Sequence, residues 1–259
     1  MMSITEKMAP RVLDGRVALV TGAGQGNGRA IALGLARAGA SVVATDVDTA
    51  TVRQTAADIK AAGGRAWSYR LDVTNAAECT ALAATVAREI GRIDLLVNNA
   101  GIVIRETFDH ADAIAHAKRT FQVNVEGTLN VTHAWLADLR ATKGCIVNLA
   151  SIGSFVGLPG VVGYSPSKGA IKMLTQSLAG ELAKDGVRVN AIAPAVVATA
   201  MTTATRENPE RLARFMQRTP LGRVAEPEEL VGPVVFLASD MASYVTGVTL
   251  PVDGGYLAV

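Results

Sequence analysis

The 259-residue sequence has few cysteines, few aromatic residues and no long hydrophobic run. Its two cysteines, Cys79 and Cys145, belong to no CxxC pair and no Cys/His cluster, which favours core-packed thiols in a reducing, cytoplasmic setting over disulfide, redox or zinc roles. The longest apolar run, residues 230–238, is far below the roughly 18 residues that a membrane span needs. The first sixteen residues contain charges and no apolar stretch, so we expect neither a signal peptide nor a membrane partner.

The sequence also lacks an excess of charge of either sign. It has 25 Lys and Arg against 23 Asp and Glu, and 4% aromatic residues, which argues against the basic surface and stacking platform of a nucleic-acid-binding protein. Hydrophobic residues make up 49% of the chain, enough for a core that needs no disulfide or structural metal. We therefore expect a globular protein with no nucleic-acid partner.

Short runs rich in Val, Ile and Leu alternate along the chain with longer segments of helical periodicity. The runs are apolar throughout, as expected for parallel strands covered on both faces. We predict an α/β fold, a single-domain, Rossmann-type, doubly wound parallel sheet of seven strands with helices on both faces. The predicted strands are 17–20, 41–45, 66–71, 93–97, 145–149, 187–193 and 248–252, and the predicted helices are 28–38, 51–62, 76–90, 121–139, 163–183 and 227–238.

Two segments stand apart from this alternation. Residues 1–14 form an N-terminal extension, expected to be frayed, before a catalytic domain of residues 15–259. Within that domain, residues 195–221 lie between a strand and a helix, are Thr-rich at the start and show helical periodicity at 211–217. We predict a lid over a site at the carboxyl ends of the strands, with an ordinary surface excursion as the alternative.

A glycine-rich segment follows the first predicted strand and leads into the first predicted helix. In this position glycines let backbone amides and the helix N-terminus approach a pyrophosphate. The glycine spacing alone is weak evidence, and the flanking strand and helix strengthen it. We predict a dinucleotide-binding loop comprising Gly22, Gln25, Gly26, Asn27 and Gly28.

Asp46 ends the second predicted strand, where a carboxylate can accept hydrogen bonds from the adenosine ribose and repel a 2′-phosphate. We therefore predict NAD as the cofactor. The nearest candidate cation, Arg29, starts a helix and more readily faces solvent. The alternative is that Asp46 caps the helix that begins near Thr49. Asp72 and Val73, at the end of the third strand, either bracket the adenine or form an exposed turn.

Tyr164, Lys168 and Ser151 form the candidate catalytic set. Tyr164 and Lys168 are four apart and share a helix face, and Ser151 closes the strand thirteen residues earlier. A phenol with an ordinary pKa near 10 needs roughly 4 kcal/mol of phenolate stabilisation to act as a base near neutral pH. A desolvated Lys168 ammonium and the positive nicotinamide of NAD⁺ can supply it, while Ser151 orients the substrate oxygen.

These residues stand in motifs that resemble those of the short-chain dehydrogenase/reductase family, and the resemblance extends over residues 15–255. Residues 21–28 resemble its cofactor turn, 98–101 its NNAG stretch and 164–168 its YxxxK motif. The resemblance implies a catalytic tetrad of Asn124, Ser151, Tyr164 and Lys168, in which Asn124 holds a water that links Lys168 to solvent. From the residues alone, Asn124 is more simply a satisfied buried amide.

The resemblance also implies further cofactor contacts and a homotetramer. Besides Tyr164 and Lys168, the implied contacts come from Asn99, Ala100, Gly101, Pro194, Val197 and Thr199. Two positions depart from the family pattern. Asn27 replaces the usual aliphatic residue in the turn that enters the first helix. Ala195 replaces the usual glycine after Pro194. Its methyl group either narrows the floor of the site beside the nicotinamide or restricts the loop to a conformation with negative φ.

His110, His116 and His133 show no ligand spacing with Cys, Asp or Glu, so we predict no metal. We predict an NAD-dependent oxidoreductase that transfers hydride between a secondary alcohol and nicotinamide. The substrate segments, 103–105, 151–163 and 195–216, resemble those of sugar and polyol dehydrogenases and offer few polar groups, so the expected partner is a polyol or related small alcohol or ketone. The alternatives are a 3-oxoacyl thioester reductase, which Gln25 and Asp46 disfavour, and a non-catalytic dinucleotide-binding module.

Overall fold

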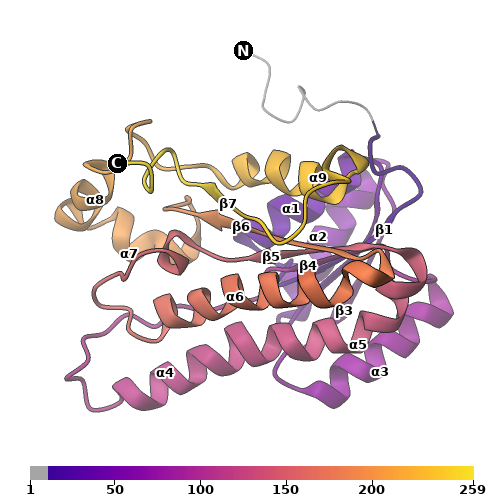
Figure 1. Ribbon diagram of the computed structural model, residues 1–259, viewed down its shortest axis with the longest axis horizontal. Coiled ribbons are helices and arrows are strands. Elements are labelled where there is room, and N and C mark those ends of the chain that lie inside the picture. The colour runs from indigo at the N-terminus through magenta and orange to yellow at the C-terminus, as the bar shows by residue number, and fades with distance from the viewer. Residues whose placement is uncertain (1–10) are drawn as a thin grey trace.

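The computed structural model describes residues 11–259, and the first ten residues of the predicted N-terminal extension lie outside this range. A seven-stranded sheet in the order β3-β2-β1-β4-β5-β6-β7 forms its centre, and every paired neighbour is parallel. Figure 1 shows the sheet running through the middle of the molecule. The predicted Rossmann-type α/β fold is confirmed. The strands are β1 Val17–Thr21, β2 Ser41–Asp46, β3 Ala66–Arg70, β4 Leu95–Asn98, β5 Cys145–Leu149, β6 Arg188–Pro194 and β7 Thr249–Val252.

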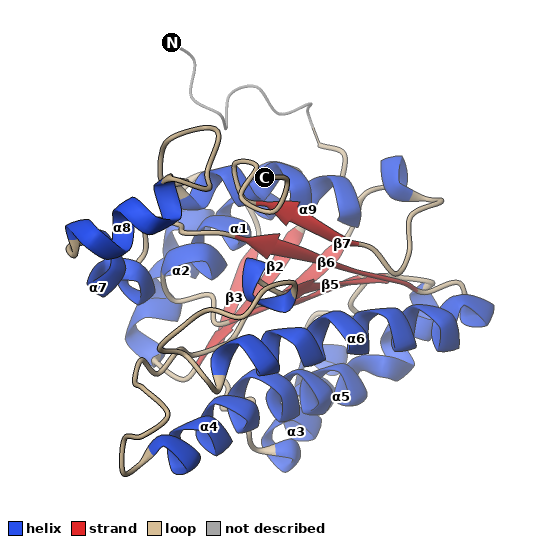
Figure 2. Ribbon diagram, turned by 60° about the vertical axis from the view of Figure 1, so that its left-hand side comes forward, coloured by secondary structure: helices blue, strands red, loops and turns tan. Residues whose placement is uncertain are grey.

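Helices cover both faces of the sheet (Figure 2). In Figure 1, α1, α2 and α9 lie above the sheet and α3, α5 and α6 below it. None of the helices within residues 11–259 is long and apolar enough to cross a membrane. The helices are α1 Gly26–Arg37, α2 Thr49–Ala61, α3 Ala76–Glu89, α4 Ala113–Phe121, α5 Gly127–Thr142, α6 Tyr164–Leu182, α7 Thr203–Arg206, α8 Pro209–Met216 and α9 Val231–Ala238.

Successive residues of each central strand enter different hydrophobic cores. In β1, Val20 packs with α1, α2 and α9 on one face of the sheet, whereas Leu19 packs with α3, α5 and α6 on the other. Both side chains are fully buried. This two-sided burial explains why the strands are apolar throughout, since neither face of the sheet meets water.

The strand order reverses between β1 and β4. The chain leaves β1 toward α1 on one face and returns from β3 through α3 on the other, so the loops after β1 and β4 diverge at the carboxyl edge of the sheet. A crevice at such a switch point is the usual ligand site of doubly wound sheets. The fold therefore places the glycine-rich turn and the NNAG stretch side by side at this edge.

Two predicted boundaries need correction. Leu13, assigned to a frayed extension, is buried, and its N–H donates to the carbonyl of Ala38 at 2.9 Å, so the packed chain begins before Gly15. The helix predicted for residues 121–139 begins earlier, with α4 at Ala113, and a π-helical turn, Gln122–Glu126, separates α4 from α5. The residues that α4 buries are Ala113 and Thr120, neither of them a large apolar side chain, so the spacing of large apolar residues does not reveal where α4 begins.

Candidate active site

Glycines stand in the glycine-rich turn at the positions where the backbones of β1 and α1 approach most closely. Gly22 and Gly26 have φ of +63° and +52°, a region that favours glycine. A Cβ at Gly28 would collide with the carbonyl oxygen of Gly22 and the side-chain amide of Asn99. The backbone can therefore approach a phosphate group as closely as the loop motif requires.

Asp46 is held by the backbone on both of its carboxylate oxygens. Its Oδ2 accepts from the N–H of Gly24 at 2.9 Å, and its Oδ1 accepts from the N–H of Asp48 at 3.1 Å. The residue that caps α2 is Asp48, which accepts from Ala50 and Thr51, so the alternative that Asp46 serves as the helix cap is wrong.

Asp72 takes part in a turn and also faces the crevice at the switch point. Its Oδ1 accepts from the N–H and the hydroxyl of Thr74, and these hydrogen bonds lower the pKa of the Asp72 carboxyl. Asp72 and Val73 both line the crevice together with Asp46. The two interpretations of this strand end, a turn and a cofactor contact, are thus compatible.

The NNAG stretch ties β4 to its neighbours. The side-chain amide of Asn98 donates to Asn148 at 2.9 Å, and that of Asn99 donates to the carbonyls of Thr21 and Gly22 at 2.9 and 3.0 Å. These hydrogen bonds fix the ends of β1 and β4 relative to each other. The floor of the crevice is therefore rigid where a cofactor would lie against Ala100 and Gly101.

The crevice has a volume of about 360 Å³, and every residue predicted to contact the cofactor lines it. Asn27, which departs from the family pattern, carries a buried Oδ1 with no hydrogen-bond partner within residues 11–259. An acceptor left without a donor in this position suits a ligand that brings an N–H or O–H group. The open turn, the ribose-side carboxylate and this acceptor fit a nicotinamide dinucleotide. Residues that sequence reasoning missed here are Val47, Leu71, Ile102, Arg119, Val123, Leu149, Ala150, Ala200, Met201 and Thr202.

Tyr164 begins α6 and Lys168 follows one turn later, so both side chains emerge at the same edge as Ser151 after β5. Lys168 is buried, with 5% of its surface exposed, and its Nζ donates to the carbonyl of Leu149 at 2.6 Å. Burial lowers the pKa of Lys168 to about 8. Burial raises the pKa of the Tyr164 phenol, and a hydrogen bond from Ser151 and the charge of Arg105 oppose that rise.

Asn124 lies in the π-helical turn, a feature often found at functional sites. Its side chain is fully engaged with protein groups, donating to the carbonyl of Ile102 and to the hydroxyl of Ser167, both at 3.0 Å, and accepting from the N–H of Ile102 at 2.8 Å. A Cβ at Gly101 would contact both Asn124 and Lys168. Asn124 thus sits beside Lys168, and its role in proton exit stays a prediction.

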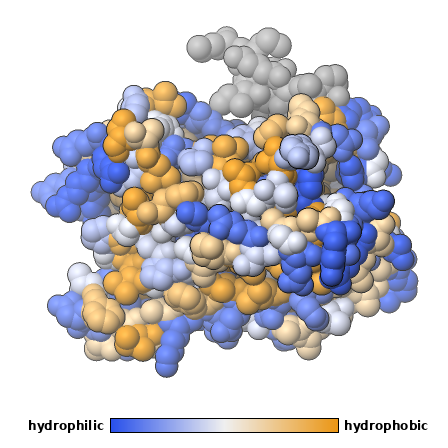
Figure 3. All heavy atoms as spheres, viewed as in Figure 1, coloured by the Kyte–Doolittle hydropathy of each residue, from blue (hydrophilic) through white to orange (hydrophobic). Residues whose placement is uncertain are grey.

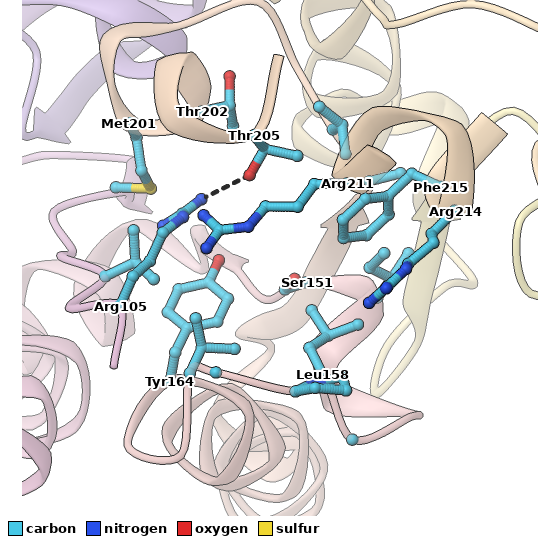
Figure 4. A pocket seen from close by; sticks show the side chains of 18 of the residues that line it. Arg105, Ser151, Leu158, Tyr164, Met201, Thr202, Thr205, Arg211, Arg214 and Phe215 are labelled. Atoms are coloured by element: carbon cyan, nitrogen blue, oxygen red, sulfur yellow. Dashed lines mark hydrogen bonds between the residues drawn. The ribbon is translucent and has the colours of Figure 1, made fainter. Parts of the chain in front are cut away.

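A second pocket, of about 440 Å³, meets the crevice at Tyr164, Ala195, Met201 and Thr202. The three predicted substrate segments all contribute to it, with Ser151 and Tyr164 in its wall. The expectation of few polar groups is wrong, because four arginines line the pocket: Arg105, Arg211, Arg214 and Arg218. Figure 4 shows the side chains of the first three. Arg211 and Arg214 are three apart in α8, a spacing that places them on one side of a helix, and Arg218 follows in the turn after α8.

The predicted lid region contains α7 and α8, and α8 has no buried residue. In Figure 3 the surface over α8, at the left edge, is strongly hydrophilic. Tyr256, in the last turn of the chain, is buried against this region, with its ring 5.8 Å from that of Phe215 and the Arg218 guanidinium 4.7 Å above it. Tyr256 therefore packs within its own chain. The homotetramer stays a prediction.

The histidines are less scattered than their spacing indicated. His116 Nδ1 lies 2.5 Å and His110 Nδ1 3.3 Å from Oε2 of Glu106, a residue at the edge of the second pocket. The two imidazole rings stack with centroids 6.0 Å apart. The statement that these histidines share no ligand spacing with an acid is therefore wrong. The absence of a metal stays a prediction.

Comparisons with known proteins match nearly the whole chain. The profile of a family described as enoyl-(acyl carrier protein) reductase matches residues 22–257. A cyclopentanol dehydrogenase from Comamonas sp. (strain NCIMB 9872) is 41% identical over 250 residues, covering 96% of this chain and 99% of its own. A galactitol 2-dehydrogenase (L-tagatose-forming) from Cereibacter sphaeroides is 42% identical over 250 residues, covering 94% and 96%. A solved gluconate 5-dehydrogenase from Burkholderia cenocepacia J2315, in complex with NADP and tartrate, has a TM-score of 0.92 at 35% identity, covering 96% of this chain and 98% of that one.

Proposed function

Because this chain belongs to the short-chain dehydrogenase/reductase family, we propose that it is an NAD⁺-dependent dehydrogenase that oxidises the secondary alcohol of a polyol, sugar or related hydroxy compound. It is an oxidoreductase that acts on CH–OH groups. The observation that carries the proposal is the meeting of the two pockets at Tyr164, with Ser151 and Lys168 beside it. At this junction a substrate carbinol and a nicotinamide ring can face each other.

In the proposed reaction, the alcohol oxygen lies between the hydroxyls of Ser151 and Tyr164. Ser151 donates a hydrogen bond that orients this oxygen, and the Tyr164 phenolate accepts its proton. When bound, the oxidised dinucleotide supplies the hydride acceptor and a positive charge. In the reverse direction Tyr164 returns the proton to the carbonyl oxygen.

Stabilisation of the phenolate is the main electrostatic requirement of this reaction. Burial alone raises the pKa of Tyr164, so the charges of Lys168 and Arg105 have to favour the ionised form. Lys168 is anchored on the carbonyl of Leu149, which keeps its ammonium at the junction of the pockets. In this proposal Asn124, which lies next to Lys168, holds a water through which the proton leaves toward solvent.

The proposal of NAD rather than NADP rests on Asp46. Its carboxylate is fixed at the end of β2 by two backbone N–H groups and cannot turn away from a 2′-phosphate without breaking them. Arg29, which could have compensated, is paired with Asp58 at 2.7 Å. The solved gluconate 5-dehydrogenase contains NADP, so family membership alone does not decide between the two cofactors.

Initial rates with NAD⁺ and NADP⁺ test this choice in the wild type, Asp46→Asn and Asp48→Asn. We expect the wild type to prefer NAD⁺, and Asp46→Asn, which is isosteric but uncharged, to raise the NADP⁺-to-NAD⁺ rate ratio about tenfold or more. Asp48→Asn is the matched control, since asparagine also caps a helix and should leave the ratio unchanged. Preference of the wild type for NADP⁺ would show that Asp46 does not repel the phosphate.

The substrate test uses a panel of secondary alcohols, polyols, sugar acids and 3-hydroxyacyl thioesters, assayed for nicotinamide reduction. The names of the relatives include a cyclic alcohol, a hexitol and a sugar acid, so the panel spans neutral and acidic compounds. Turnover of a small alcohol or sugar acid supports the proposal. Turnover only of thioesters with NADP⁺ would favour the 3-oxoacyl reductase alternative.

A further inference from the structure

Three arginines of the substrate pocket, Arg105, Arg211 and Arg214, have no carboxylate partner within residues 11–259, whereas Arg218 donates to the main-chain oxygen of Val259 at 3.1 Å. Elsewhere in this range arginines are commonly paired, as Arg29 is with Asp58, Arg140 with Asp185 and Arg223 with Glu229. The carboxylate of Glu106, at the pocket edge, is directed at His110 and His116. The pocket therefore concentrates positive charge that its own side chains do not neutralise.

Two of these arginines converge at the reacting end of the pocket. Figure 4 shows the guanidinium groups of Arg105 and Arg211 pointing toward each other next to the Tyr164 hydroxyl. Burial, together with the charge of Arg211, lowers the pKa of the half-buried Arg105. Like charges brought together out of water are costly unless an anion joins them.

Arg105 is fixed for this role. Its Nη2 donates to the hydroxyl of the buried Thr205 in α7 at 3.2 Å, which links the loop after β4 to the lid region. A guanidinium has five N–H donors, and this is the single side-chain hydrogen bond that Arg105 makes within residues 11–259. The guanidinium of Arg211 donates no hydrogen bond to another group within residues 11–259. Both groups have donors free for a ligand.

The positive charge of these arginines lies in the substrate pocket and not in the cofactor crevice. None of the four arginines lines the cofactor crevice, where the cations are Arg119 and Lys168. Ser151 and Tyr164, in contrast, lie in the wall of the arginine-lined pocket. An anion held there must belong to the molecule whose alcohol Tyr164 faces.

We propose that the alcohol substrate carries an oxyanion, a carboxylate or a phosphate, close to the reacting carbon, and that Arg105 and Arg211 bind it in a forked arrangement. This inference rests on the proposed dehydrogenase function and deepens it, because it selects acidic over neutral compounds. Guanidinium groups match the planar geometry of a carboxylate and bind phosphate equally well. The pocket volume of about 440 Å³ accommodates a small hydroxy acid or sugar acid.

The test compares substrates that differ only in the charged end. Gluconate and glucitol share one carbon skeleton, glucitol 6-phosphate adds a phosphate, and further aldonic acid and alditol pairs cover other stereochemistry. We expect kcat/KM for the best acid to exceed that of its neutral partner at least tenfold. Preference for gluconate identifies a carboxylate, and preference for the phosphate ester identifies a phosphate, either of which supports the inference. Equal rates for acid and neutral partners would overturn it and leave the dehydrogenase function intact.

Variants then connect the preference to the two arginines. Arg211→Gln should reduce the acid-to-neutral ratio of kcat/KM by ~10- to 100-fold, mainly through KM, and Arg211→Lys should restore part of it. Arg105→Gln should act in the same direction. The matched control is Arg65→Gln, an exposed position before β3 at the opposite edge of the sheet, which should change nothing. An equal loss with acid and neutral substrates would instead mean that the arginines serve Tyr164 alone.

Calorimetric titration of gluconate and glucitol 6-phosphate into the cofactor-free protein gives a readout that does not depend on turnover. We expect the preferred oxyanion to bind the wild type and Arg65→Gln alike and to bind Arg211→Gln at least tenfold more weakly. If no alcohol reduces nicotinamide but this difference in binding persists, the proposed function fails and the anion site stands. Equal binding to wild type and Arg211→Gln would overturn the anion site.

Discussion

The cofactor crevice and the substrate pocket meet at Tyr164 but are built in different ways. The crevice consists of glycines, backbone groups and short side chains held by internal hydrogen bonds, such as those of Asn99 and Asp46. The substrate pocket is formed by long side chains from segments far apart in sequence, among them Arg105 and Arg211. The comparison teaches that a cofactor, which is the same molecule throughout a family, can be recognised by a local sequence motif. A substrate, which differs from one family member to another, is recognised by side chains that the tertiary fold brings together.

The largest effect is expected at Tyr164, which belongs to both regions. Tyr164→Phe removes the proposed proton acceptor and should lower kcat about a thousandfold, while dinucleotide binding changes little. The measurement is steady-state turnover together with a fluorescence titration of the cofactor. Tyr244→Phe is the matched control, because Tyr244 is fully exposed. Full activity of Tyr164→Phe would support the alternative of a non-catalytic dinucleotide-binding module.

The crevice should tolerate added atoms poorly. Gly28→Ala drives a methyl group into the carbonyl of Gly22, so we expect a loss of about 3 kcal/mol in unfolding free energy and weak cofactor binding. Gly180→Ala is the control, because its position in α6 has no neighbour within 4 Å of an added Cβ, and alanine favours a helix. Urea unfolding measures both variants. Equal stabilities would mean that the turn is not close-packed.

The same contrast explains which features the sequence predicts. The strands, the glycine turn and the Tyr164/Lys168 spacing depend on local periodicity, which one sequence contains in full. The sequence alone left open whether Asp46 caps α2. The structure shows that Asp48 does, because α2 begins at Thr49, and the exact first residue of a helix is hard to predict from periodicity. The cluster of arginines in the substrate pocket could not be predicted from the sequence, because it depends on contacts between distant segments. Arg105 and Arg211 are over a hundred positions apart, and only the path of residues 195–221 brings them together.

Lys168 lies where the two regions join, and its burial should make stability depend on pH. Because the folded state lowers its pKa from 10.5 to about 8, the charged form is penalised below pH 8 and the penalty disappears as the pH rises to 10.5. Relative to Lys168→Met, the cofactor-free wild type should gain roughly 2 kcal/mol between pH 7 and 10. Urea unfolding at both pH values measures this, with exposed Lys184→Met as control. Parallel pH profiles for wild type and Lys168→Met would contradict the desolvation of this ammonium.

The smallest effect is expected at Arg29, and it sharpens the comparison from the crevice side. Arg29 lies near the cofactor loop, but its charge is paired with Asp58 on α2 and does not line the crevice. Arg29→Gln should therefore leave the NADP⁺-to-NAD⁺ rate ratio within about twofold of wild type, and its unfolding curve should match that of Arg140→Gln, another surface pair. A tenfold change in the ratio would mean that Arg29 leaves Asp58 to meet a 2′-phosphate. Cofactor choice would then depend, like the proposed substrate choice, on a guanidinium group rather than on the fixed carboxylate of Asp46.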